Sequence, residues 1–402
     1  MNYDPIAIFA EWLRELLTSW NLSDDFATVI LKLIGAVVVA GLALGIFILQ
    51  TWLERKVAGR MQDRFGPNRV GPFGLLQPIA DALKMVTKED TTPESADKVS
   101  YNIAPVMAVF AVLMIWGVVP YSSTWVGTDL DVGVLYIGAV GSFGVLAVLM
   151  AGWSSNNKYA LLGAFRGVAQ LISYEVPLLL SLVIPVFLAR SMNLNEIIGK
   201  QGDVGWFIVF APLAFVIFFI SNLAEIGRTP FDLLEAESEI VAGYHVEYSG
   251  MKFGLFQAGE FAHSFASAAL ISILFFGGWQ PAASPWLGAV VFFAKTTFFY
   301  FVIMWIRLTL PRIRIDHMMA MNWKFIVPLN IILLMTVPLL DYFVKDLGAT
   351  RMYAHFGLNM VLLIGAIVVA GRAIKKSEPD RVRFPERAVA VPPKEETEEV
   401  AA

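Results

Sequence analysis

Long apolar stretches, each about as long as a bilayer is thick, recur along this 402-residue chain. A transmembrane helix needs roughly 20 apolar residues. It must also satisfy its own backbone polar groups, which favours helices over open sheets. The pattern therefore predicts an all-α, polytopic membrane protein with about nine transmembrane helices. The nine stretches lie near 28–53, 102–121, 132–152, 161–189, 205–225, 256–278, 286–308, 325–343 and 353–371.

The composition agrees with this class. Hydrophobic residues make up 57% of the chain and charged residues 16%, whereas about a quarter of a soluble domain is charged. There is no cysteine, which excludes thiolate-ligated iron–sulfur clusters and zinc sites within the chain. If electrons are transferred, a partner must carry them. We expect the chain to contact the lipid bilayer and to bind no nucleic acid.

The two ends differ from the apolar centre. Residues 5–20 place apolar side chains on one helical face, which predicts an interfacial amphipathic helix within an N-terminal segment 1–25. Residues 26–376 form the predicted transmembrane domain. The tail, 377–402, mixes Pro with charged residues and is predicted to be a disordered cytoplasmic segment.

Basic residues gather in alternate connections between the predicted spans. Cytoplasmic connections carry an excess of Lys and Arg. The rule predicts a multi-pass protein of the inner (cytoplasmic) cell membrane, with its N-terminus outside and its C-terminus in the cytoplasm. The basic residues on the predicted cytoplasmic side are Arg55, Lys56, Arg60, Arg64, Arg69, Lys84, Lys88, Lys98, Lys158, Arg228, Lys252, Arg312, Arg314, Arg372, Lys375 and Lys376.

The first cytoplasmic connection combines a turn and an amphipathic helix. Its GPNRVGPFG core lacks both GxxxxGK[ST] and GxGxxG, so a phosphate-binding loop is not expected. The following residues, 75–88, alternate apolar and polar faces at helical spacing. Two interpretations stay open here: an anchor helix, or the rim of an entrance for a lipophilic ligand.

The connection from Ala224 to Phe256 is unusually acidic for so apolar a chain. Thr229 followed by Pro230 predicts the start of a helix, and Gly243 its end. A solvated acidic helix face is one interpretation. The aromatic second half of the connection favours another, in which the loop is docked against protein or membrane and its carboxylates are easily perturbed.

Ionisable residues also occur inside the predicted spans, where they are costly and usually functional. Glu175 lies in the fourth span, two residues before Pro177, which cannot donate to the carbonyl of Ser173. Glu260 lies in the sixth span, and a purely structural pair with Lys295 is the alternative for it. Glu260 and His263 have the spacing of a di-iron ligand pair, but the motif occurs once, so no metal is expected.

Three segments resemble one family closely. LERKVAGRMQDRFGPNRVGPFGLLQPIADALK, LISYEVPLLL and AEIGRTPFDLLEAESEIVAGYHVEYSGMKFGLF resemble the quinone-proximal H subunits of proton-pumping NADH-quinone oxidoreductase, respiratory complex I. The resemblance covers about residues 25–345, and the last predicted span lies beyond it.

The resemblance implies a function. It implies a membrane subunit that forms part of a quinone tunnel and couples quinone reduction to proton translocation. The quinone is a substrate, and FMN and iron–sulfur clusters are expected only in partner subunits. Expected partners are the peripheral iron–sulfur and quinone-site subunits and the antiporter-like membrane subunits. The implied proton path comprises Glu175, Glu225, Glu235, Glu237, Glu239 and Glu260, and the implied quinone residues are Arg55, Asp81, Phe231 and Asp232.

Two alternatives are distinct from this interpretation. A related membrane subunit of an energy-converting hydrogenase would share the fold but reduce no quinone. A secondary transporter using Glu260 and Lys295 would show inverted repeats, and the sequence contains no convincing internal repeat.

Overall fold

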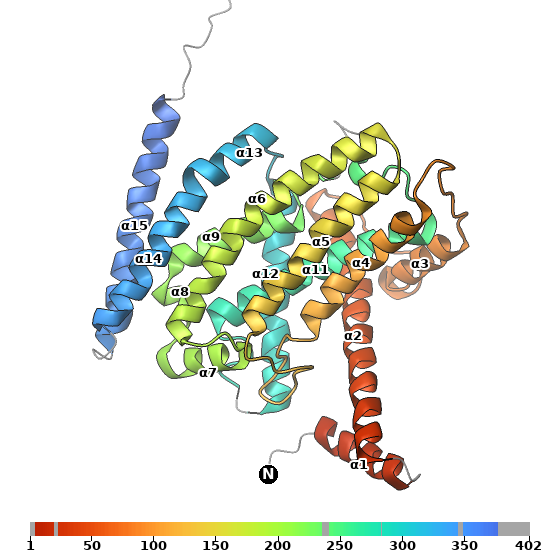
Figure 1. The fold of residues 1–402 in the computed structure, drawn as a ribbon, viewed down its shortest axis with the longest axis horizontal. Helices are drawn as coiled ribbons and strands as arrows, with labels where there is room; N and C mark the ends of the chain where they lie inside the picture. Colours follow the sequence, from red (N-terminus) through yellow and green to blue (C-terminus); the bar gives the residue numbers. More distant parts are fainter. Residues whose placement is uncertain (1–4, 20–22, 235–240, 283, 345–348, 377–402) are drawn as a thin grey trace, which may run out of the picture.

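The computed structural model describes residues 5–19, 23–234, 241–282, 284–344 and 349–376 (Figure 1). Within these ranges the chain is helical and contains no strand, only an isolated bridge between Pro120 and Val126. The helices are α1 (Pro5–Ser19), α2 (Asp24–Met61), α3 (Gln77–Thr87), α4 (Lys98–Trp116), α5 (Gly133–Ser154), α6 (Lys158–Ala189), α7 (Leu194–Val204), α8 (Phe207–Phe210), α9 (Pro212–Ile226), α11 (Gly250–Phe276), α12 (Pro285–Thr309), α13 (Ile315–Met321), α14 (Val327–Val344) and α15 (Ala349–Lys376).

The all-α, polytopic class is confirmed. Eight helical segments in the described ranges are long and apolar enough to cross a membrane, and one of them joins α13 to α14 through a π-helical turn at Asn322–Ile326. The shorter apolar helix α9 occupies the predicted fifth span. That span is divided because the chain leaves helical geometry at Ala211, immediately before Pro212. Proline suits the first position of the new helix.

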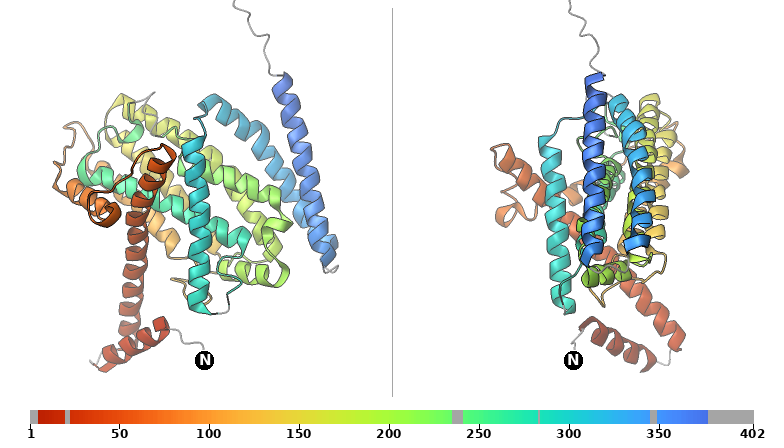
Figure 2. Two further views of the ribbon diagram at one scale, coloured as in Figure 1. Left: turned by 180° about the vertical axis from the view of Figure 1, so that it is seen from behind. Right: turned by 90° about the vertical axis from the view of Figure 1, so that its left-hand side faces the viewer.

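The two predicted amphipathic helices flank the bundle. In Figure 1, α1 lies crosswise at the start of α2, and α3 lies beside the other end of α2. In the left view of Figure 2, α2 stands near one side of the bundle, and in the right view it runs obliquely behind other helices. In the most apolar stretch of α2 only 6% of the residues are buried, whereas in the most apolar stretch of α11 78% of them are buried. The helix α11 is therefore the centre around which the others pack.

A hydrogen bond that α6 loses at Pro177 is replaced by a side chain from the π-helical turn before α14. Because Pro177 has no N–H, the carbonyl of Ser173 loses its helical donor. The Nδ2 atom of Asn322 donates to that carbonyl at 2.5 Å, and Asn330 Nδ2 donates to the carbonyl of Pro177 at 2.7 Å. Both asparagines are fully buried. Unsatisfied carbonyls are costly in a bilayer, so these amides allow α6 to carry a proline next to Glu175.

Candidate functional site

Glu175 and Glu225 line the same small internal cavity. Glu225 is buried in the last turn of α9, and Glu175 lies half-buried in the middle of α6. Ser142 Oγ of α5 donates to Glu175 Oε1 at 2.8 Å. Among the described residues, Glu225 Oε2 is buried and has no hydrogen-bond partner. The cavity they share has a volume of about 30 Å³, which is enough for a water molecule.

A larger cavity adjoins the first one. Its volume is about 90 Å³, and it is lined by Glu225, Glu260 and His263 among mainly apolar side chains from α4, α5, α6, α9 and α11. Glu225, His263, Ile115 and Gly141 line both cavities. The two cavities are therefore neighbours, with Glu260 on the larger one, Glu175 on the smaller one and Glu225 on both, and each is large enough for a water molecule.

Small residues of α5 leave this space open. Gly141 lines both cavities and Gly144 the larger one, and a Cβ atom at either position would meet nothing within 4 Å. Helical glycines are destabilising by roughly 0.5–1 kcal/mol relative to alanine. The role of Gly141 and Gly144 was not predicted from the sequence, although GVLYIGAVGSFG places four glycines in one apolar span.

A buried ion cluster adjoins Glu260. Arg228, which is 3% exposed, lies 2.6 Å from Glu54 Oε1 through its Nη1 atom and 3.1 Å from Glu260 Oε1 through its Nε atom. Arg307 of α12 also pairs with Glu54. The hydroxyl of Tyr300 donates to Glu54 Oε2 at 3.4 Å. The cluster joins α2, the end of α9, α11 and α12 in one network of charge.

This cluster was only partly predicted. The sequence predicts Arg228 only as a cytoplasmic basic residue, and it assigns no place in an ion cluster to Glu54, Arg307 or Tyr300. The available signal was the position of Glu54 and Arg307 near the ends of two apolar segments. The structural pair of Glu260 with Lys295 is wrong. Lys295 Nζ donates instead to the carbonyls of Phe276, Gly278 and Gln280, at 2.7, 3.1 and 2.6 Å.

The four candidate quinone residues form two pairs of neighbours. Arg55 of α2 binds Asp81 of α3 at 2.5 Å, and Lys84 binds the other oxygen of Asp81 at 3.1 Å. Partial burial favours the neutral acid, but the hydrogen bonds from Arg55 and Lys84 outweigh it and hold the pKa of Asp81 below its ordinary value. The ion pair is therefore formed at neutral pH.

The second pair lies after α9. Phe231 is 3% exposed and packs against Tyr174, with ring centroids 5.5 Å apart, and Asp232 forms an ion pair with Arg312 at 3.1 Å. The ion pair of Glu54 with Arg228 connects the two regions, because Glu54 precedes Arg55 and Arg228 lies three residues before Phe231.

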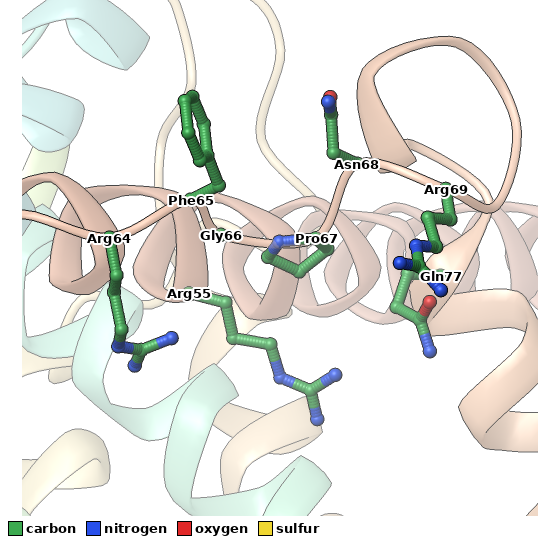
Figure 3. Close-up of a pocket in the computed structure, with 8 residues that line it drawn as sticks. All are labelled: Arg55, Arg64, Phe65, Gly66, Pro67, Asn68, Arg69 and Gln77. Carbon is green, nitrogen blue, oxygen red and sulfur yellow. The ribbon is translucent and has the colours of Figure 1, made fainter.

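An open pocket occupies the connection between α2 and α3. Its volume is about 740 Å³, and its lining includes Arg55, Arg64, Arg69 and Gln77. Figure 3 shows the guanidinium groups of Arg55 and Arg64 on one side of the loop and the ring of Phe65 on the other. The loop is tight because a Cβ atom on Gly74, whose φ is +76°, would lie 2.3 Å from the carbonyl oxygen of Pro67.

The predicted helix from Thr229 to Gly243 is wrong over its described residues. Residues 229–234 form turns and bends. Tertiary contacts override the local helix signals here: Gln170 Nε2 donates to the carbonyls of Ala224 and Phe231, at 2.8 and 2.7 Å, and Leu233 is fully buried. Glu235, Glu237 and Glu239 lie outside the described residues.

The second half of the same connection is docked, as predicted. Tyr248 stacks on Tyr101 of α4 with ring centroids 4.1 Å apart, and Asn157 Nδ2 donates to Glu247 Oε1 at 2.5 Å. Burial lowers the pKa of His245 to about 4, so the imidazole is neutral at physiological pH. In the described ranges, no group of three or more His, Asp or Glu side chains is arranged to hold a metal ion.

Comparisons with known proteins place this chain in a family. Residues 34–338 match the profile of the family described as NADH dehydrogenase. The H subunit of the NADH-quinone oxidoreductase of Dehalococcoides mccartyi is 45% identical over 344 residues, 85% of this chain and 95% of that protein. The H subunit of the Geobacillus kaustophilus enzyme is 48% identical over 325 residues, 80% and 95% of the two chains. The H subunit numbered 1 of Geobacter metallireducens is 47% identical over 313 residues, 74% and 94%.

Proposed function

The chain belongs to the NADH dehydrogenase family, and from this premise we propose that it forms part of the quinone tunnel of a proton-pumping NADH-quinone oxidoreductase and couples quinone reduction to proton translocation. The observation that carries the proposal is a continuous series of charged groups. It runs from Arg55 at the open pocket through the pair of Glu54 and Arg228 to Glu260, and then along the two cavities to Glu225 and Glu175.

The open pocket suits the head group of a quinone. Its arginines supply hydrogen-bond donors for quinone oxygens, and exposed apolar side chains of the adjoining α3, including Leu83 and Val86, suit a lipophilic tail. Phe73, which is 74% exposed, lies at the same connection, and its carbonyl is held by Trp52 Nε1 at 3.2 Å. We assign Arg55 and Asp81 to binding of the quinone, and Phe231 and Asp232 to the tunnel wall.

The mechanism follows from electrostatics. Reduction of a quinone to a quinol takes up two electrons and two protons, and until the protons arrive the electrons add negative charge beside Arg55. Glu54 adjoins Arg55 and shares Arg228 with Glu260, so a charge change at the pocket alters the field at Glu260. A changed field shifts the proton affinity of nearby carboxylates. Waters in the two cavities then allow a proton to move between Glu260, Glu225 and Glu175.

The remaining assignments complete the proposal. Glu235, Glu237 and Glu239, which lie outside the described residues, are assigned to the same proton path. Electrons arrive from partner subunits that hold FMN and iron–sulfur clusters, and antiporter-like membrane subunits receive the conformational or proton signal. The chain lies in the cytoplasmic membrane with its N-terminus outside. The similar proteins are named as subunits of NADH-quinone oxidoreductase, which favours this function over the energy-converting hydrogenase.

The test is a carboxamide substitution in the assembled complex. Glu175→Gln keeps the size of the side chain and the bond from Ser142 but removes the exchangeable proton. We expect NADH-driven proton uptake by membrane vesicles to fall by about 10²-fold or more, while Glu175→Asp retains part of it. Wild-type proton uptake by Glu175→Gln, at equal amounts of assembled complex, would remove Glu175 from the path.

A further inference from the structure

One histidine lies at the junction of the two internal cavities. His263 is one helical turn after Glu260 on α11, and it lines both the 90 Å³ cavity and the 30 Å³ cavity. Glu260 lines only the larger cavity, and Glu175 only the smaller one. A proton that moves from Glu260 to Glu175 must therefore pass the place where the two cavities meet.

Four residues line both cavities, and two of them can carry a proton. Ile115 and Gly141 have no exchangeable side-chain proton, whereas Glu225 and His263 do. A carboxylate accepts and releases a proton at one end. An imidazole can accept a proton at one ring nitrogen and release a proton from the other. It can therefore pass a proton from one cavity to the other.

From this geometry we propose that His263 is a proton-transfer residue that links Glu260 with Glu225 and Glu175. The inference rests on the proposed function of the carboxylate path. In the transfer, one ring nitrogen of neutral His263 takes a proton from the side of Glu260, directly or through a cavity water. The other nitrogen gives up its proton toward Glu225. The release leaves the imidazole neutral but in the opposite tautomer, and a flip of the ring restores the starting tautomer, so the cycle has no net consumption of protons.

The electrostatic surroundings of His263 are acidic. The titratable groups that line the cavities with it are Glu175 from α6, Glu225 from α9, Glu260 from α11 and Tyr244 from the connection before α11, and Arg228 is paired with Glu260 one step farther away. The residues of α4 and α5 that line the cavities are apolar or glycine. These carboxyl groups, when ionised, stabilise the imidazolium formed in transit and offset part of the cost of burying its charge.

The experiment removes the imidazole ring of His263 and then supplies free imidazole in solution. His263→Ala is introduced into the whole complex, and NADH-driven proton uptake and quinone reduction are measured in native membrane vesicles. We expect both rates to fall at least about tenfold, since a proton relay contributes 10² or more. Imidazole in the buffer should restore proton uptake several-fold, because the removed side chain enlarges the cavity. Pyrazole, which has the same size but is a much weaker base, should not restore it.

Matched variants separate the possible causes. Ser272→Ala removes a buried hydroxyl from the same helix away from both cavities and should leave both rates unchanged. If His263→Ala fails to assemble, His263→Gln preserves the bulk of the ring and should lose proton uptake in the same way, without rescue by imidazole.

The outcomes distinguish this inference from the proposed function. Wild-type proton uptake by an assembled His263 variant, or equal rescue by imidazole and pyrazole, would overturn the role of His263 while a loss in Glu225→Gln keeps the carboxylate path. Wild-type proton uptake by both Glu225→Gln and Glu175→Gln would overturn the path itself, whatever His263 does.

Discussion

Two groups of buried charge in this bundle are built in opposite ways. At the junction of α14 and α15, both oxygens of Asp341 are engaged, by Arg351 at 2.7 Å, His355 at 3.2 Å and Arg190 at 3.3 Å. At the centre of the bundle, Glu225 has a buried oxygen with no hydrogen-bond partner among the described residues, and it adjoins two cavities. The carboxylate of Asp341 is fully paired, whereas that of Glu225 borders space large enough for a water molecule.

This difference separates structural charges from functional ones in a membrane. A fully paired carboxylate stays ionised, because its protonation would leave the buried cationic partners without a counter-charge. A carboxylate beside a hydrated cavity can change its proton state without breaking an ion pair. The Asp341 cluster therefore holds α15 on the bundle, and the carboxylates around Glu225 are suited to proton transfer.

The polar face of α15 supports the structural assignment. Arg351, His355 and Asn359 follow one another at four-residue intervals, so they share one helical face. Asn359 Nδ2 donates at 3.0 Å to the carbonyl of Phe210, directly before the break between α8 and α9. The helix lies beyond residues 34–338, the part that matches the family profile, and these contacts attach it to that part.

The largest expected effect concerns Glu225. Glu225→Gln should lower NADH-driven proton uptake by about 10²-fold or more, because an amide cannot exchange the proton. Glu225→Asp is the control that keeps the titrating group and should retain part of the rate. Normal proton pumping by a complex that contains wild-type amounts of Glu225→Gln would contradict the role of Glu225 in proton transfer.

The Asp341 cluster should respond in stability. Asp341→Asn leaves Arg351 and Arg190 without a carboxylate. We expect the free energy of unfolding to fall by about 3 kcal/mol. This is the low end for a broken buried ion pair, because Arg190 is largely exposed. Thermal unfolding of the purified complex measures this loss. Asp24→Asn, which breaks an exposed pair with Arg14, should cost less than about 1 kcal/mol. A changed number of protons pumped per electron in Asp341→Asn would contradict the purely structural role.

A third effect comes from a neutral histidine outside the spans. The pKa of His245 is about 4 in the folded chain and about 6.5 when unfolded, so the unfolded state binds more protons between these values. Stability is complete above pH 6.5 and falls as the pH decreases toward 4. His245→Leu should remove this dependence, a difference of about 2 kcal/mol between pH 7 and pH 5. Parallel pH curves of thermal unfolding for the two proteins would show that His245 is not the cause.

The smallest effect tests the cavity without touching a titrating group. Gly144→Leu fills the space beside Glu260 and should slow proton uptake on the order of tenfold, equivalent to ~1.4 kcal/mol in the barrier. Gly35→Leu on α2 is the matched control, since a Cβ atom there also meets nothing within 4 Å but borders neither cavity. Equal rates for the two variants would mean that water in the cavity is dispensable.

Much of the fold could be predicted because apolar length alone specifies a membrane span. The division of the fifth span had a local signal, Pro212, and the two amphipathic helices had their periodicity. The turns after Thr229 had no such signal. They depend on Gln170, 59 residues before Thr229, which binds one backbone carbonyl before Thr229 and one after it. Local helix preference is weak against contacts of this kind.

The site was predictable as residue types but not as an arrangement. Buried carboxylates such as Glu175 stand out in apolar segments. The ion pair of Glu54 with Arg228 joins residues 174 positions apart, and the open cavity depends on glycines at Gly141 and Gly144 that look like ordinary members of an apolar helix. Pairing and free volume are properties of packing, and packing is not readable from one apolar segment at a time.

The central claim is that quinone reduction changes the proton state of Glu225. Infrared difference spectra of the complex, recorded between its oxidised and quinol-reduced states, measure this directly through the carbonyl stretch of a protonated carboxyl group. The account predicts a carboxyl band that changes on reduction and disappears from the spectrum of Glu225→Gln. A difference spectrum that is identical in the wild type and in Glu225→Gln would contradict it.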